Sequence, residues 1–181
     1  ALDVTSGNLS IGILTATNLK VGSSATIFAT TTNGAGIGTV TPRAALDVTG
    51  HARLKTVSEE VGIVTVVSNQ LKIYLNEAST FICTITDDIS RIRLYNADKT
   101  NTAQSFTLKL VQNSTGGYGV GINTIHNGDD DAISVYWPGG VVPDVTTTAD
   151  KTDIYSFKIF DGADLDNQGI FGVITGQNFT A

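Results

Sequence analysis

Ala45-Leu46-Asp47-Val48-Thr49 repeats, residue for residue, the stretch Ala1-Leu2-Asp3-Val4-Thr5 that opens the sequence. A perfect five-residue repeat in so short a chain is rarely a coincidence, and repeats are a first guide to the fold because repeated units bury their apolar faces against neighbouring units. In both copies apolar residues alternate with polar ones, and this period of two indicates a β-strand. The sequence therefore predicts a repetitive β-structure, with more of it expected upstream of residue 1.

The segments around the repeat follow the same pattern over residues 1–57. Short apolar alternations are separated by turn-forming Gly, Ser and Asn residues, and Phe28 is the one aromatic residue of this region. Ordering each residue costs ~1–2 kcal/mol, which the burial available to one such chain does not offset. Three intertwined copies would bring the same apolar positions onto a common axis and remove free sheet edges. We therefore expect a trimeric β-shaft; a flexible Gly/Thr linker is the alternative, and the regular alternation argues against it. The expected axis residues are Leu2, Val4, Ile11, Ile13, Leu46, Val48 and Leu54.

Composition limits the classes of partner. Charged residues make up 15% of the 181 residues and the net charge is −6, so the phosphates of a nucleic acid would be repelled. No uninterrupted apolar run approaches the ~18 residues of a membrane span, so we expect no membrane insertion. Methionine is absent, even at position 1, and we expect a piece of a longer or processed product. Cys83, the single cysteine, lies in an apolar run and is expected to be a small buried hydrophobe.

Residues 58–181 form the second expected domain. They hold nearly all of the aromatic residues, and runs of alternating apolar residues are separated by turn clusters, which is typical of a β-sandwich or barrel. We predict an all-β fold with a jelly-roll-like β-sandwich knob here, after the shaft. The expected strands lie near Gly62–Ser68, Gln70–Asn76, Thr80–Thr86, Ile89–Asn96, Ser105–Gln112, Ala132–Trp137, Asp153–Phe160 and Gly169–Thr175.

Two motifs carry a resemblance to a known class of protein. The run from Gly36 to Gly50, GIGTVTPRAALDVTG, resembles an element of tailed-phage fibre shafts, and Gly12–Thr17, GILTAT, is similar to a segment found beside it, especially in phages of marine bacteria such as cyanophages. The ending also resembles that of phage fibre and tail proteins, in YWPGGVVP from Tyr136, TTTADKTDIYSFK from Thr146, and GQNF from Gly176. Ile170 and Phe171 stand where that ending has an aromatic pair.

The resemblance implies a structural protein of the phage virion. Its expected partners are further copies of itself in a homotrimer, other virion proteins, and a glycan or protein of the bacterial surface. The leading hypothesis is a non-enzymatic fibre that attaches to the host. The alternative is a capsid, collar or tail decoration protein that contacts virion proteins and never the host. A depolymerase is a third hypothesis, which would require a convergent acidic cleft.

Candidate binding residues are few. Tyr118, Tyr136 and Trp137 are candidate sugar-stacking residues for receptor binding; Trp137 has core packing as its other role, and Tyr118, in a Gly-rich loop, is expected to be the most exposed. Two acidic segments are candidate Ca²⁺ loops, because clustered carboxylates supply the oxygen ligands that Ca²⁺ takes. Those acidic residues are Asp129, Asp130, Asp131, Asp161, Asp164 and Asp166. Solvated turns are the alternative for both segments, and no other cofactor is expected.

Overall fold

The computed structural model describes residues 35–37, 44–97 and 102–180. The chain divides into two compact units, Ala1–Lys55 and Thr56–Ala181. In the first unit, β1 (Ala35–Ile37) pairs in parallel with β2 (Leu46–Val48), and Ala35, Gly36 and Ile37 face Leu46, Asp47 and Val48. The two halves of the fibre-like motif thus pair with each other within one chain. The earlier copy of the repeat and Pro42 lie outside the described residues.

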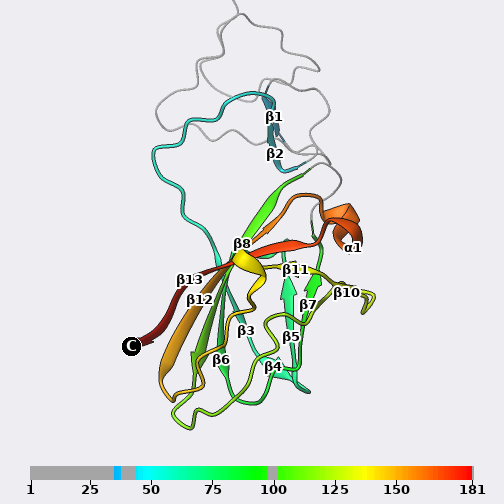
Figure 1. Cartoon of the computed structure of the whole chain (residues 1–181). Helices are drawn as coiled ribbons and strands as arrows, with labels where there is room; N and C mark the ends of the chain where they lie inside the picture. Colours follow the sequence, from blue (N-terminus) through cyan, green and yellow to red (C-terminus); the bar gives the residue numbers. More distant parts are fainter. Residues whose placement is uncertain (1–34, 38–43, 98–101, 181) are drawn as a thin grey trace, which may run out of the picture. The chain divides into compact units, whose positions relative to one another are not determined.

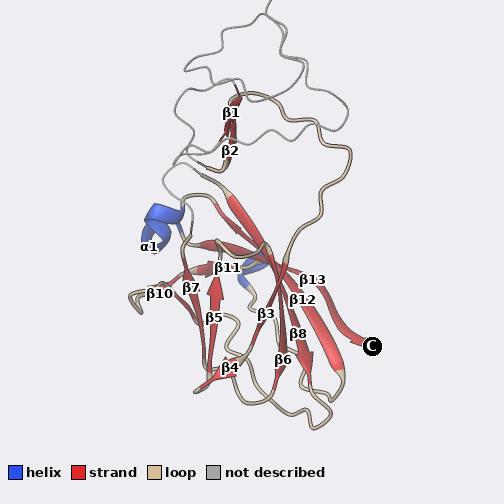
Figure 2. Cartoon of the chain, turned by 180° about the vertical axis from the view of Figure 1, so that it is seen from behind, coloured by secondary structure: helices blue, strands red, loops and turns tan. Residues whose placement is uncertain are grey.

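The second unit consists of two sheets that share one core (Figure 1). The six-stranded sheet has the order β11-β13-β12-β8-β6-β3 and the five-stranded sheet the order β10-β9-β7-β5-β4. Strands dominate the fold (Figure 2), so the expected all-β class is correct. The strand bounds are β3 (Val61–Val64), β4 (Val66–Val67), β5 (Gln70–Tyr74), β6 (Thr80–Ile85), β7 (Arg91–Tyr95), β8 (Gln104–Gln112), β9 (Ile125–His126), β10 (Ala132–Ile133), β11 (Val135–Tyr136), β12 (Lys151–Ile159) and β13 (Ile170–Thr180).

From β3 to β9 the chain passes back and forth between the two sheets, and only β4 and β5 are consecutive strands of one sheet. Strands β3, β6 and β8 are parallel neighbours in one sheet, and β5, β7 and β9 are parallel neighbours in the other. A parallel pair needs a crossover of a dozen or more residues, and here a strand of the opposite sheet occupies each crossover. Antiparallel pairing is confined to β4–β5, β9–β10 and the β8–β12–β13 set. This mixed pairing differs from the all-antiparallel order of a jelly roll.

Two predicted strands prove to be two strands each. Gly62–Ser68 divides at Thr65 into β3 and β4, and Ala132–Trp137 divides at Ser134 into β10 and β11, with the parts in different sheets. The apolar residues on either side of each break still point into the common core, so alternation alone does not reveal the change of sheet. Strand β9, with only two residues, was missing from the prediction, and β13 continues five residues beyond the expected Thr175.

The core lies between the two sheets and is built from alternate residues of each strand. Along β8, Phe106, Leu108 and Leu110 are buried, and the residues between them are more exposed. Tyr155, fully buried on β12, and Phe157 continue the same layer, with Phe157 stacked on Phe106 at 4.8 Å between ring centroids. Two 3₁₀ turns (Pro138–Gly140 and Gly162–Asp164) and the one-turn helix α1 (Leu165–Gln168) complete the described elements.

Candidate functional site

The outer surface of the five-stranded sheet carries a regular array of polar and aromatic side chains. Leu71 and Ile73 of β5 and Ile92 and Leu94 of β7 are buried, so the residues between them face outward. We call this outward surface the ladder face. Its members are Gln70, Lys72 and Tyr74 on β5, Arg91, Arg93 and Tyr95 on β7, and His126 on β9.

Parallel pairing in register aligns similar residues across the ladder face. Gln70 faces Arg91, Lys72 faces Arg93, and Tyr74 faces Tyr95. The two tyrosine rings are stacked, with centroids 4.8 Å apart and planes inclined by 18°. Lys72 and Arg93 carry like charges and are directly opposed, which destabilises a sheet. A carboxylate near either of them would stabilise the arrangement.

Asp130 supplies that carboxylate. Nη1 of Arg91 donates to both carboxylate oxygens of Asp130, at 2.9 and 2.8 Å, and Nε of Arg93 lies 3.7 Å from Oδ1. Nδ1 of His126 lies 3.5 Å from Oδ1 and 2.8 Å from the backbone oxygen of Asp130. Asp130 has a φ of 78°, in the left-handed region that side chains rarely adopt. The loop thus directs one carboxylate into a group of three basic side chains.

The loop that carries Asp130 is shaped by Asn127. Its Oδ1 accepts hydrogen bonds from the backbone N–H groups of Asp129 (3.0 Å) and Asp131 (2.9 Å), an Asx-turn pattern that fixes the backbone locally. The backbone oxygen of Gly128 accepts from Nη2 of Arg93 at 2.8 Å. A Cβ atom at Gly128 would lie 3.2 Å from the Tyr95 ring, so the loop packs closely on that ring. The loop therefore packs directly on the ladder face and is hydrogen-bonded to it.

Two groups on the ladder face keep unused binding capacity. Lys72 is exposed and makes no hydrogen bond or ion pair with any residue that the structure describes. Strand β4 pairs only with Gln70 and Leu71, so β5 is the edge of the sheet at Tyr74. The half-buried Tyr74 ring is stacked on Tyr95. This edge offers a cation and an aromatic ring to a ligand.

Sequence reasoning missed the ladder face, although the sequence contains a signal for it. Residues 70–74 read QLKIY and residues 91–95 read RIRLY, so both have a polar residue, a cation and a tyrosine at alternate positions. That shared pattern predicts that the two strands present similar outer faces. It does not predict that they lie side by side, because the intervening β6 belongs to the other sheet.

The expected receptor-binding residues fall in three different settings. Trp137 is 7% exposed, donates from Nε1 to Oδ1 of Asn123 at 3.0 Å, and packs edge-on against Phe157, so core packing is its role here. Tyr118 is half-buried and packs against the core, contrary to its expected exposure, because its backbone oxygen accepts from the buried Gln112. Tyr136 is 48% exposed.

Tyr136 belongs to an exposed aromatic cluster, which we define as Tyr136, Phe160 and Phe171. The Phe171 ring lies 5.2 Å from that of Tyr136 and 5.4 Å from that of Phe160, between ring centroids. All three side chains are between 44% and 54% exposed. Clustered exposed aromatic side chains are typical of protein–protein contacts.

The side-chain amide of Asn127 forms hydrogen bonds with both acidic segments. Nδ2 of Asn127 donates to Asp131 at 3.3 Å and to Asp166 at 3.2 Å. Asp164 accepts from Asn167 at 2.6 Å, and Asp161 accepts from the backbone of Ala163. Within residues 35–37, 44–97 and 102–180 no group of three or more His, Cys, Asp or Glu side chains is arranged to hold a metal ion. Calcium binding stays a prediction, which a calcium titration of the melting temperature would test.

The expected axis residues can be examined in part. Leu2, Val4, Ile11 and Ile13 lie outside the described residues. Leu46 is 60% exposed and Leu54 is 67% exposed in the single chain, while Val48 is partly buried. Residues 44–55 therefore leave two large apolar side chains, Leu46 and Leu54, in water.

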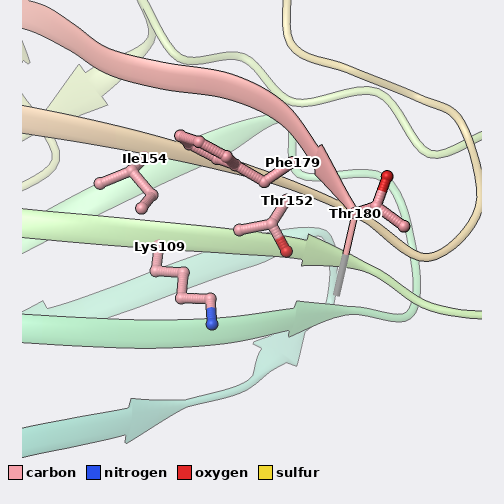
Figure 3. A pocket seen from close by; sticks show the side chains of 5 residues that line it. All are labelled: Lys109, Thr152, Ile154, Phe179 and Thr180. Atoms are coloured by element: carbon pink, nitrogen blue, oxygen red, sulfur yellow. The ribbon is translucent and has the colours of Figure 1, made fainter.

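A shallow groove lies on the outer side of the six-stranded sheet (Figure 3). It has a volume of about 220 Å³ and is lined by Lys109, Thr152, Ile154, Phe179 and Thr180. Phe179 lies over Gly176, where a Cβ atom would approach the ring to within 2.3 Å. The lining offers one cation and little other polarity, so it provides no acid–base pair for a reaction.

Comparison with known proteins gives no assignment: no protein-family model, no curated protein and no solved structure matches this chain. In the part of the chain that the structure describes, no helix is long and apolar enough to cross a membrane.

Proposed function

We propose that this chain is a non-enzymatic structural protein of a bacteriophage virion, a trimeric fibre that attaches to the surface of a bacterial host. The N-terminal region, residues 1–57, forms the intertwined β-shaft, and residues 58–181 form the knob. Three knobs on one shaft offer three equal sites, so individually weak contacts combine through effective concentration. The fibre-like motifs at Gly36–Gly50 and at the C-terminal end support the phage assignment by resemblance.

One contrast between the two units carries the proposal. The second unit buries a continuous core of its own, from Leu71 to Ile170. Residues 44–55 of the first unit include no buried side chain, and Leu46, in the repeat, and Leu54, after it, are more than half exposed. Burying a side chain of this size stabilises a fold by ~1.5–3 kcal/mol. The second unit also exposes apolar residues, such as Ile63 at 73%, but it has a buried core beside them. The first unit is therefore the one that gains most stability from further copies of itself.

Attachment is tested with fluorescently labelled full-length chain and a panel of marine bacterial strains. The proposal predicts saturable binding to a subset of strains, which unlabelled chain competes away. Immunogold electron microscopy of the virions would place the label on a fibre. Absence of cell binding together with label on the capsid or collar would contradict attachment.

A second candidate function is favoured by the exposed aromatic cluster of Tyr136, Phe160 and Phe171. Such a cluster suits a contact with another virion protein, as in a capsid, collar or tail decoration protein. The change Phe171→Asp would then release the chain from the virion, and the unchanged chain would show no cell binding. As a fibre knob, the Phe171→Asp chain would stay on the virion and bind cells as the unchanged chain does, since this cluster would not be needed for attachment.

A further inference from the structure

We propose that the ladder face binds a saccharide unit that carries a carboxylate, such as a uronic acid in a bacterial surface glycan. This inference rests on the proposed attachment function, for which it names the site and the class of ligand. The contact residues would be Lys72 and Tyr74 at the edge strand β5, with Arg93 and Tyr95 beside them on β7.

The charge argument begins with Asp130. Both of its carboxylate oxygens accept from Nη1 of Arg91, and the carboxylate lies near Arg93 and His126, so the ladder face already accommodates one carboxylate. That carboxylate offsets Arg91, and Lys72 in the next rung keeps an ammonium group without a partner among the described residues. An anionic ligand is therefore expected at Lys72 and not at Arg91.

The aromatic argument concerns the rung next to Lys72. Residues two apart along a strand are about 6.5–7 Å apart and share one face, so Lys72 and Tyr74 lie roughly one sugar ring from each other. The exposed part of the half-buried Tyr74 ring provides an apolar platform for the C–H groups of such a ring. The polar array beside it, Gln70 and Arg93, supplies donors for hydroxyl groups. Flat apolar contact combined with a few directed polar groups is typical of small-ligand sites.

A saccharide fits these observations better than a single-stranded nucleic acid does. Aromatic rings beside basic residues also bind oligonucleotides, but such sites follow a charged backbone along an extended basic groove. Apart from Arg91, which is hydrogen-bonded to Asp130, the ladder face offers two cations, Lys72 and Arg93, in a chain with a net charge of −6. One carboxylate on one sugar ring matches that limited charge.

The test uses the full-length chain and isothermal titration calorimetry. The probes are a galacturonate hexamer, the same hexamer as its methyl ester, and a ten-residue oligothymidylate. The methyl ester keeps the ring and removes the charge, so we expect it to bind at least tenfold more weakly than the acid. Raising the salt from 0.05 to 0.5 M should weaken binding of the acid, since screening reduces contacts between exposed charges.

Variants identify the face. Lys72→Gln and Tyr74→Ala should each weaken binding of the galacturonate hexamer by about three- to tenfold, the range of exposed ionic and aromatic contacts. Lys158→Gln and Phe179→Ala, on β12 and β13 of the six-stranded sheet, are matched controls and should leave the affinity unchanged. Lys72 and Lys158 lie on the outer sides of the two sheets, so neither change is expected to unfold the chain. A loss of binding in Lys72→Gln alone therefore reports on the site.

Three results would overturn the inference: equal affinity for the acid and its methyl ester, tighter binding of the oligothymidylate, or loss of binding in the two control variants alone. No binding of the acid at millimolar concentration, by a chain that still attaches to cells, would also overturn it while leaving the attachment function intact. Failure of cell attachment with retained binding of the acid would contradict the proposed function and not the site.

Discussion

Asp153 is the residue on which one end of the knob depends. It is 2% exposed and lies at the start of the buried layer of β12. Its carboxylate accepts hydrogen bonds from the backbone N–H groups of Thr146 (2.7 Å) and Asn178 (2.9 Å), and from the hydroxyl of Tyr155 (3.1 Å). Nε2 of Gln177 lies 3.4 Å away and also bonds the Tyr155 hydroxyl at 3.1 Å. Each of these four groups is a hydrogen-bond donor. The carboxylate therefore connects the loop at Thr146, strand β12 and the end of strand β13.

The change Asp153→Asn tests this network. The amide group would place an N–H against one of the donors in either orientation, leaving buried polar groups unpaired at a cost of about 1–3 kcal/mol each. We expect a melting temperature lower by about 5–12 °C, measured by circular dichroism. Asp150→Asn, an exposed control three residues earlier, should change it little. Equal melting temperatures for the two variants would show that the network is not important for stability.

Stability at alkaline pH depends on two further buried groups. Burial raises the pKa of the Cys83 thiol to about 11. Burial first, and the Asp153 carboxylate second, raise the pKa of the Tyr155 hydroxyl above its ordinary value. In both cases the folded state binds the proton more tightly than the unfolded state does. Their contribution is therefore complete below the ordinary pKa and is lost as the pH rises toward the folded pKa.

For Cys83 this window runs from pH 9 to about 11, between the ordinary pKa of 9.0 and the folded value. We expect the free energy of unfolding to fall across this window, by about 2–3 kcal/mol from this thiol. Urea titrations at several pH values measure it. In Cys83→Ala the decrease in the free energy of unfolding across this window should be smaller by that amount. The same pH dependence in the variant and the unchanged chain would contradict the attribution to Cys83. The thiol should also resist iodoacetamide at pH 8 until the chain unfolds.

At the scale of elements, close packing against glycine positions β13. A Cβ atom at Gly172 would lie 2.7 Å from Cζ3 and 2.8 Å from Cη2 of Trp137, a contact too short for ordinary packing. Gly172 faces Phe157 across the β12–β13 pair, and Trp137 packs edge-on against that same ring. Strand β13 can approach the core only because this position has no side chain.

Gly172→Ala should therefore destabilise the knob by about 1–3 kcal/mol, the usual range for an added methyl group in a packed core. Because Trp137 is the only tryptophan, its fluorescence should shift if the ring is displaced. Gly119→Ala is the matched control: only Oδ1 of Asp88 lies near its Cβ position, at 3.7 Å. Equal stability of the two variants would contradict the packing argument.

The same elements explain what the sequence could and could not predict. Period-two alternation found the long strands, such as the one around Phe106, because each has one buried face. It could not reveal that the chain changes sheet at Thr65 and Ser134, since alternation continues through both residues. It also could not place β5 beside β7, so the stacked tyrosines and the clustered basic residues of the ladder face appeared only in the fold. The ion pairs of Asp130 with Arg91 and Arg93 join its loop to a strand distant in sequence, which local patterns do not encode.

At the scale of the whole molecule, the central claim is that the first unit is completed by other copies of the chain. We expect the double variant Leu46→Asp and Leu54→Asp to dissociate the trimer, because charges placed on a common axis repel one another and lose their water. Val141→Asp is the control: Val141 is 71% exposed on the second unit, and its change should leave the oligomer intact. Sedimentation velocity of the three proteins measures the effect. Dissociation in the control, or none in the double variant, would contradict the axis assignment.

Native mass spectrometry of the unmodified chain at micromolar concentration tests the central claim most directly. A trimeric fibre predicts a dominant species of three times the 18.9 kDa chain mass. A dominant monomer of 18.9 kDa under the same conditions would contradict the shaft, and with it the trimeric fibre.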